Sequence, residues 1–301
     1  MTSDALENAA HLLRGAESLL ICAGAGMGVD SGLPDFRGTQ GFWQAYPALR
    51  ASGIDFHEIA NPAAFDADPL LAWGFYGHRL QLYRDTVPHA GFAILRDLAA
   101  SMPGGAFVFT SNVDGQFQRA GFKEDQVVEC HGSIHHLQCT LPCSNSIWAA
   151  DAVAPLVDMA ACRLRSPLPR CPRCGAAARP NILMFNDGAW IAARTKAQFE
   201  RLRRWRQAPN KLVVIELGAG IDIPSVRRMS EQQGVPIVRI NPRAAQLGRH
   251  PGVAISLTAL AALQSFAGLD QSQTIIAKPL ILFRKHRYPQ EMWITMWKSR
   301  S

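Results

Sequence analysis

The chain has 301 residues, and its composition of 48% hydrophobic and 18% charged residues excludes a disordered or fibrous protein. Its longest mostly apolar run, residues 19–29, is too short and too rich in glycine to span a bilayer, and residues 1–15 lack the pattern of a signal peptide. The net charge of +7 falls on segments that we interpret as solvated helix faces and a basic C-terminal end, so we expect a cytoplasmic protein that binds neither membranes nor nucleic acid.

Short apolar segments alternate with helical ones along much of the chain. In chain order we predict a helix at 4–14, a strand at 18–23, a helix at 90–100, and strands at 106–110, 126–129, 211–217 and 235–240. Continuous apolar strands between helices are typical of a parallel sheet covered on both faces. The predicted fold class is therefore α/β, with a Rossmann-like sheet whose ligands bind beyond the carboxyl ends of the strands.

Two segments break this pattern. Residues 39–90 are rich in aromatic residues, proline and glycine, and residues 135–180 hold five of the seven cysteines. We predict that they form a small helical and zinc-binding module inserted into one large domain that spans 1–267. The sheet parts of that domain are predicted at 1–38, 91–134 and 181–267, and the basic residues 268–301 form a C-terminal tail of no predicted structure.

The cysteines of the second segment form two close pairs. Three residues separate Cys139 from Cys143, and two separate Cys171 from Cys174. Zinc takes four tetrahedral ligands, and four thiolates leave no open coordination position, so we predict one structural zinc ion. Cys162 lies between the pairs and could replace one ligand.

Two glycine turns follow predicted strands. Gly24-Ala25-Gly26 and Gly218-Ala219-Gly220 would let the backbone approach a pyrophosphate, and Asn241 ends the next strand, where it could bind a ribose. Purely structural turns are the alternative interpretation. A hydride-transferring dehydrogenase is not predicted, because the third glycine of its fingerprint is displaced and no acidic residue follows about twenty positions later.

In their order, these motifs resemble those of the sirtuin family. Residues 24–38 resemble the sirtuin cofactor loop, 110–114 its T-Q-N-I-D segment, His131-Gly132 its catalytic H-G pair, and 179–187 its peptide-binding strand. The resemblance extends over about residues 5–265. It departs from the family pattern at Gly28, at Ser111, at the second glycine turn and at Asn186-Asp187.

The resemblance implies NAD-dependent removal of acyl groups from protein lysines, with nicotinamide and O-acyl-ADP-ribose as products. His131 would act as general base on a ribose hydroxyl, since an imidazole accepts a proton near neutral pH, and Asn112 and Asp114 would hold the nicotinamide amide and a water. The implied cofactor contacts are Gly24, Ala25, Gly26, Asp35, Phe36, Arg37, Ser111, Asn112, Val113, Asp114, Gly218, Ala219, Gly220 and Asn241. Phe185 and Asn186 would contact the acylated-lysine peptide.

Tyr76 and Arg79 bear on the acyl group. They have a Y-x-x-R spacing, which places both on one face of a predicted helix and resembles the signature of sirtuins that remove negatively charged acyl groups. An arginine binds a carboxylate by charge-assisted hydrogen bonds, so succinyl and malonyl groups are candidate substrates beside acetyl. The alternative is an ordinary helix with one surface arginine.

Two other functions stay open. One is an ADP-ribosyltransferase or NAD hydrolase on the same scaffold, because residues 112–118 resemble a stretch of macrodomain-linked sirtuins; His131 argues against it, since simple transfer needs no such base. The other is a zinc-ribbon protein that binds nucleic acid without catalysis. That hypothesis explains the cysteines and the charge but leaves Asn112, Asp114 and His131 without a role.

Overall fold

The computed structural model describes residues 2–34, 39–141, 143–208 and 211–274. Its centre is a six-stranded parallel sheet in the order β11-β10-β9-β1-β2-β3. The strands are β1 (Ser18–Ala23), β2 (Ala106–Thr110), β3 (Val127–Glu129), β9 (Leu212–Leu217), β10 (Ile237–Ile240) and β11 (Gly252–Ile255). The chain runs outward from β1 through β2 to β3 and later from β9 through β10 to β11. The direction of winding therefore reverses between β1 and β9, the kind of point where such sheets bind ligands.

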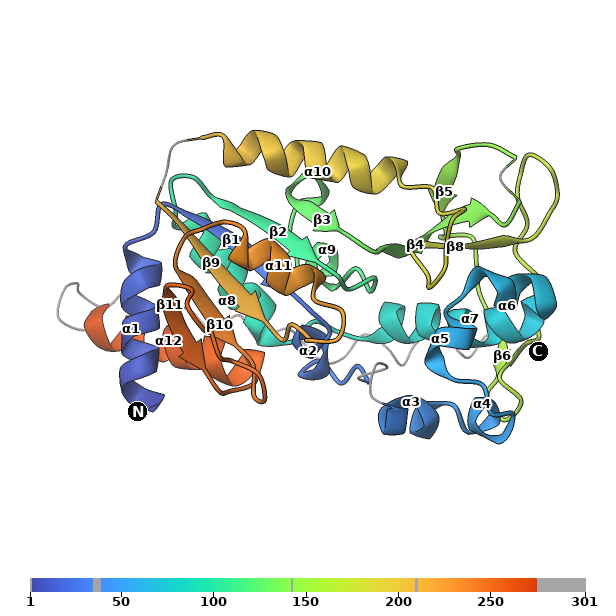
Figure 1. Cartoon of the computed structure of the whole chain (residues 1–301), viewed down its shortest axis with the longest axis horizontal. Coiled ribbons are helices and arrows are strands. Elements are labelled where there is room, and N and C mark those ends of the chain that lie inside the picture. The colour runs from blue at the N-terminus through green and yellow to red at the C-terminus, as the bar shows by residue number, and fades with distance from the viewer. Residues whose placement is uncertain (1, 35–38, 142, 209–210, 275–301) are drawn as a thin grey trace, which may run out of the picture.

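The sheet is covered by helices on both faces (Figure 1). One face carries α1 (Thr2–Arg14), α8 (Ala90–Ala100) and α12 (Ala259–Thr274), and the other carries α10 (Ala193–Arg206) and α11 (Ser225–Glu231). Along β1, Leu19 and Ile21 pack into the first core, and Leu20 and Cys22 pack into the second. Side chains alternate between the faces of a strand, so burial on both faces explains the uninterrupted apolar sequence.

The remaining elements form a smaller module beside the sheet (Figure 1). Its helices are α3 (Thr39–Ala45), α4 (Pro47–Ala51), α5 (Phe56–Ile59), α6 (Pro62–Ala67) and α7 (Pro69–Asp85). Its strands are β4 (Gly132–Cys139), β5 (Ile147–Ala149) and β8 (Ala178–Ile182), in the antiparallel order β5-β4-β8, with the hairpin of β6 (Val157–Asp158) and β7 (Arg163–Leu164). Three short elements lie in the connections between strands. Along the chain, α2 (Gly26–Val29) follows β1, and α9 (Gln116–Arg119) and the 3-10 turn η1 (Glu124–Gln126) come between β2 and β3.

Helix α7 joins the two segments of the module. The indole nitrogen of Trp73 donates a hydrogen bond to the carbonyl of Ala178 at 2.7 Å, and Gly74 lies so close to Cys162 that an added Cβ would be 1.9 Å from its carbonyl oxygen. Cys162 is fully buried under α7 and lies outside the cysteine cluster, so it is not the substitute metal ligand that the sequence allowed.

Helix α12 continues beyond the predicted end of the domain at 267 and reaches Thr274. The other domain boundaries stay predictions. In the part of the chain that the structure describes, no helix has both the length and the hydrophobicity that crossing a membrane requires.

Candidate active site

The two glycine turns lie against each other at the reversal between β1 and β9. Gly26 donates its amide hydrogen to the carbonyl of Gly218 at 3.1 Å, and a Cβ added to Gly24 or Gly26 would come within 2.6 Å or 2.7 Å of Gly218 backbone atoms. Gly218 itself has a φ of +59°. The turns therefore require glycine for close packing of one backbone on the other, a reason that sequence analysis did not anticipate.

The loop after β2 directs polar groups toward the same edge of the sheet. Asn112 donates its side-chain amide to the carbonyl of Gly24 at 3.0 Å, which ties this loop to the first glycine turn. Burial raises the pKa of Asp114 to about 6, although its carboxylate accepts a hydrogen bond from the amide of Gln116. The hydroxyl of Ser111 is buried and has no hydrogen-bond partner among the described residues, so it is available to a ligand.

His131 follows β3, which runs parallel to β2, so it lies at the same edge of the sheet as these loops. Its Nε2 is 3.3 Å from the hydroxyl of Ser225, the first residue of α11. The next residue, Gly132, has a φ of +79°, and a Cβ there would be 2.1 Å from the carbonyl oxygen of Asn181. The H-G pair thus combines a side chain that faces the site with a glycine that lets β4 meet β8.

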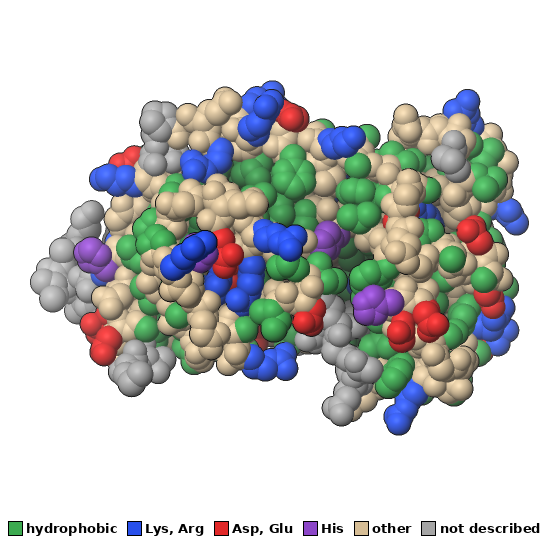
Figure 2. All heavy atoms as spheres, viewed as in Figure 1, with side chains coloured by type: hydrophobic (Ala, Val, Ile, Leu, Met, Phe, Trp, Pro, Cys, Tyr) green, Lys and Arg blue, Asp and Glu red, His purple; other side chains and the backbone are tan. Residues whose placement is uncertain are grey.

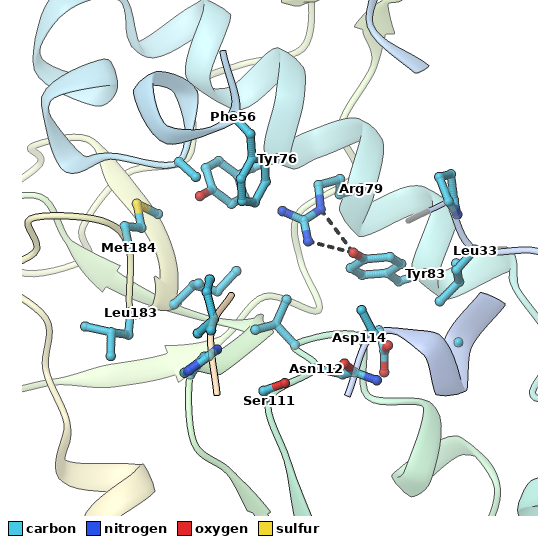
Figure 3. Close-up of a pocket in the computed structure, with 18 of the residues that line it drawn as sticks. Leu33, Phe56, Tyr76, Arg79, Tyr83, Ser111, Asn112, Asp114, Leu183 and Met184 are labelled. Atoms are coloured by element: carbon cyan, nitrogen blue, oxygen red, sulfur yellow. Dashed lines mark hydrogen bonds between the residues drawn. The ribbon is translucent and has the colours of Figure 1, made fainter. Parts of the chain in front are cut away.

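A cavity of about 280 Å³ brings most of these residues together. Ala25, Ser111, Asn112, Asp114 and His131 line it on the side of the sheet, and α7 closes it on the side of the module (Figure 3). Figure 2 shows the molecule hollowed between its two parts, with hydrophobic side chains around the hollow. The cavity therefore lies at the carboxyl ends of β1, β2 and β3, as the fold class predicts.

A second cavity of about 470 Å³ continues along the sheet edge and shares Ala25 and Ile223 with the first. Gly218, Ala219 and Gly220 line it, together with Asn241. The Asn241 side chain donates to the carbonyl of Ala219 at 2.9 Å and accepts from two amides of its own loop. It holds this loop in place, and its contact with a ribose stays a prediction.

Helix α7 places Tyr76, Arg79 and Tyr83 in the wall of the first cavity (Figure 3). Their exposed fractions are 1%, 8% and 4%, so Arg79 is not the surface arginine of the alternative interpretation. Its guanidinium lies 5.1 Å from the ring centre of Phe75 and is bonded to the Tyr83 hydroxyl. Tyr76 and Arg79 line one cavity, and so does Tyr83, four residues after the arginine, which sequence analysis missed. Their contact with an acyl group stays a prediction.

The predicted peptide-binding segment follows β8 and borders the same cavity. Phe185 lines it and packs against His57, with ring centres 4.3 Å apart. Asn186 has a φ of +54°, a conformation that asparagine tolerates better than most residues, so it can stand where the sirtuin pattern has glycine. Asp187 forms a fully buried ion pair with Arg179 at 2.7 Å, which anchors the segment.

The four predicted zinc ligands converge at the outer end of the module. The sulfur atoms of Cys139, Cys143, Cys171 and Cys174 all lie within 4.8 Å of one another, near the spacing of about 3.8 Å that Zn–S bonds of about 2.3 Å give in a tetrahedron. Backbone amides of Cys174 and Arg173 lower the pKa of Cys171 to about 7, which favours a thiolate. The donor set fits a structural zinc ion.

The geometry agrees with comparisons to known proteins. Residues 24–214 match the family described as the Sir2 family. The chain belongs to the Sir2 family. It is 31% identical to NAD-dependent protein deacylase 1 of Pseudomonas aeruginosa, over 80% of this chain and 89% of the relative. It is 30% identical to the NAD-dependent protein deacylase of Thermus thermophilus, over 80% of this chain and 86% of the relative.

Solved structures support the Sir2 fold. A Sir2 homologue in complex with NAD matches with a TM-score of 0.65 at 23% identity, over 90% of this chain and 95% of that one. A point mutant of a Sir2 homologue in complex with ADP-ribose matches with a TM-score of 0.65 at 24% identity, over 91% of this chain and 99% of that one. The sequence resemblance to sirtuins and the predicted α/β fold class are thereby confirmed.

The residues of this Sir2-family protein fit its cofactors. Two adjoining cavities, backbone turns at their junction and the buried hydroxyl of Ser111 suit an extended dinucleotide such as NAD. Asp35, Phe36 and Arg37 lie outside the described residues, so their contacts with NAD stay predictions. Sequence analysis also missed Ser225, which is 94 positions from His131 and carries no local signal of their proximity.

Proposed function

We propose that this Sir2-family protein is a protein-lysine deacylase that uses NAD, with His131 as its general base. The observation that carries the proposal is the cavity that holds His131, Asn112 and Asp114 together beside the two packed glycine turns. The acylated-lysine peptide would reach it past Phe185 and Asn186. The predicted cytoplasmic location belongs to this proposal, because a reducing compartment keeps the free cysteines of the cluster available to a metal.

Bound NAD would supply the electrophilic ribose carbon and the leaving nicotinamide. Ser111, Asn112 and Asp114 would orient the nicotinamide end in the first cavity, and the second cavity would take the adenosine end beside Gly218-Ala219-Gly220. His131 would remove the proton from a ribose hydroxyl through its imidazole. The apolar wall of Leu33, Phe56 and Ile182 would keep water from the reacting centre.

Within residues 112–118, the stretch that resembles macrodomain-linked sirtuins, Gln116 and Phe117 have structural roles. Gln116 is 1% exposed and donates to the carbonyl of Thr86 at 3.2 Å, and Phe117 is 2% exposed in the first sheet core. These two residues support the loop of Asp114 and do not line either cavity. Their similarity to the transferase stretch therefore does not favour transfer over deacylation.

The proposal is tested with acetyl-lysine and succinyl-lysine peptides, NAD and mass spectrometry of the products. We expect deacylated peptide, nicotinamide and O-acyl-ADP-ribose, and a loss of about 100- to 10,000-fold in His131→Ala. His11→Ala, on the exposed side of α1, is the matched control and should keep full activity.

Nicotinamide release without deacylation, or ADP-ribose on a protein, would replace the deacylase with a hydrolase or transferase. Salt-dependent nucleic-acid binding without any turnover of NAD would support the non-catalytic zinc-ribbon hypothesis.

A further inference from the structure

Backbone contacts fix the position of His131 but not the plane of its ring. The amide of Cys130 donates to the carbonyl of Thr110 at 2.9 Å, and the carbonyl of His131 accepts from the amide of Leu183 at 2.9 Å. The last side-chain torsion of histidine has a broad energy profile, so these bonds do not set the plane of the imidazole. A general base must lie within hydrogen-bond reach of the proton that it takes. A side-chain partner that orients the ring therefore matters to the reaction.

Ser225 is such a partner. Its hydroxyl is 3.3 Å from Nε2 of His131, and both residues are half-buried. Two positions earlier, Ile223 lines both cavities. The segment that carries Ser225 therefore runs between the space proposed for the nicotinamide end of NAD and the space proposed for its adenosine end, and the serine meets the imidazole near their junction.

Helix α11 supports this hydroxyl firmly. The amide of Arg228 donates to the carbonyl of Pro224 at 2.8 Å, which closes the first turn of the helix. Val226 is 2% exposed and packs into the second core of the sheet. Further along the helix, Ser230 is fully buried and bonded to Glu216 of β9. The hydroxyl at the start of the helix therefore belongs to a backbone that is anchored on the sheet.

The helix does not use this hydroxyl as its own cap. A serine at the start of a helix often accepts a hydrogen bond from an unpaired backbone amide. Here the capping position is Pro224, and among the described residues no side chain caps the helix. Ser225 occupies the first helical position, and its hydroxyl meets His131 instead. Capping therefore does not account for the serine.

We propose that Ser225 is a positioning residue for His131: its hydroxyl sets the plane of the imidazole and stabilises the imidazolium that forms when His131 takes the proton of a ribose hydroxyl. The inference rests on the proposed deacylase function and adds a residue that acts on its base. The proton passes from the ribose oxygen to the ring, and none passes to Ser225. The serine therefore acts through His131.

A hydroxyl suits both protonation states of the ring. It can donate to Nε2 while that nitrogen has a lone pair, and it can rotate and accept from Nε2 once both ring nitrogens carry hydrogen. The second bond is charge-assisted, and such bonds are about twice as strong as neutral ones. The serine therefore favours the imidazolium over the neutral ring, which helps His131 to take the proton.

Charged groups of several elements lie around His131 and bear on its titration. Two line the same cavity, two form an ion pair at the end of β3, and one lies one helical turn after the serine; they are Asp114 and Arg79, Glu129 and Arg194, and Arg228. Substitutions of the serine leave all five in place. A difference between serine variants therefore reports the hydroxyl.

The experiment measures kcat and KM against pH with acetyl-lysine peptide in the wild type, Ser225→Ala and Ser225→Thr. We expect Ser225→Ala to lower kcat about three- to tenfold, the effect of one hydrogen bond, and to keep KM for NAD and for peptide within about twofold. The acidic limb of its kcat profile should move to lower pH by about half a unit, because the imidazolium loses a stabilising bond. Ser225→Thr keeps a hydroxyl and should restore both properties.

Ser230→Ala is the matched control, because it removes from the same helix a hydroxyl that bonds to Glu216 and not to His131. It should lower the urea midpoint of unfolding and keep the wild-type pH profile of kcat. An unchanged profile in Ser225→Ala, or a Ser225→Thr variant as slow as Ser225→Ala, would overturn the inference. A shifted limb in Ser230→Ala would overturn it too, since loosening of α11 would then explain the shift.

Failure of the inference and failure of the proposed function give different results. If the wild type deacylates the peptide and Ser225→Ala behaves like it, the deacylase stands and the inference fails. If no peptide is deacylated, the proposed function fails, and an NMR titration of the His131 ring, assigned with His131→Ala, decides the inference without turnover. A midpoint that moves to lower pH in Ser225→Ala and returns in Ser225→Thr would support it, and equal midpoints would overturn it.

Discussion

The two walls of the active-site cavity are built in different ways. On the sheet side, backbone packs on backbone, with Gly24, Gly26 and Gly218 in mutual contact. On the module side, the wall consists of large side chains from α7 around Arg79. The sheet wall therefore tolerates no side chain at three positions, whereas the module wall is made of side chains that can be exchanged without moving one backbone off another. A sheet wall of this kind suits the part of a ligand that does not vary, and a module wall suits the part that does.

The largest expected effect is the loss of folding on removal of zinc, which should affect the module and not the sheet. We expect Cys171→Ser, or a strong chelator, to remove the ion and unfold the outer end of the module, because structural zinc contributes about 10 kcal/mol or more to small metal-bound folds. The sheet has its own cores on both faces and should stay folded. Hydrogen exchange, read separately for β1 and for residues 139–178, measures this difference.

Cys162→Ser is the control for this prediction, because Cys162 is buried outside the cluster. It should retain one equivalent of zinc by metal analysis. Loss of zinc from Cys162→Ser would return Cys162 to the ligand set. If Cys171→Ser lost as much hydrogen-exchange protection in the sheet as in residues 139–178, the two regions would fold as one unit.

The second effect concerns the sheet wall. Gly218 and Gly248 have φ values of +59° and +60°, but a Cβ added to Gly218 would lie 2.5 Å from Gly26, and one added to Gly248 would meet nothing within 4 Å. Gly218→Ala should lower the free energy of unfolding by about 2–5 kcal/mol, the sum of backbone strain and overpacking. Gly248→Ala should show only the strain, about 1–2 kcal/mol. Urea denaturation of both variants measures the difference. Equal losses of unfolding free energy would mean that the two glycine turns can move apart at little cost in stability.

Sequence patterns predicted the sheet wall better than the module wall. The bounds of β1 and β2 agree with the prediction because a strand buried on both faces leaves a continuous apolar run that a turn ends sharply. Strand β11 was missed because it is short, begins with Gly252 and has one fully buried side chain, that of Ile255.

In the module, sequence patterns reveal the residue types but not their pairing. Its helices α3 to α6 are short, and its core is aromatic without a helical period. The four cysteines were predictable because zinc fixes their number and spacing. Arg179 and Asp187 were both noted as part of a motif, yet only the turn between them shows that they pair. The hydrogen bonds from Arg79 to the Tyr83 hydroxyl likewise depend on side-chain direction, which spacing does not specify.

The smallest expected effect concerns Asp114, on the sheet wall. Burial raises the pKa of this carboxyl to about 6 in the folded protein, above its ordinary value near 4. Because the pKa of Asp114 is higher in the folded protein, the protonated carboxyl contributes fully to stability below about pH 4. This contribution is lost as the pH rises through 6, so at pH 8 the charged carboxylate destabilises the fold by at most about 3 kcal/mol.

Asp114→Asn carries no charge at any of these pH values. Its unfolding free energy should therefore match that of the wild type at pH 4 and exceed it at pH 8, while deacylation is impaired. Denaturation curves at the two pH values check the sign. If Asp114→Asn were less stable than the wild type at pH 8, the fold would stabilise the charged carboxylate, and the prediction would be wrong. The opposite signs expected for stability and activity would mark Asp114 as a residue kept for the reaction.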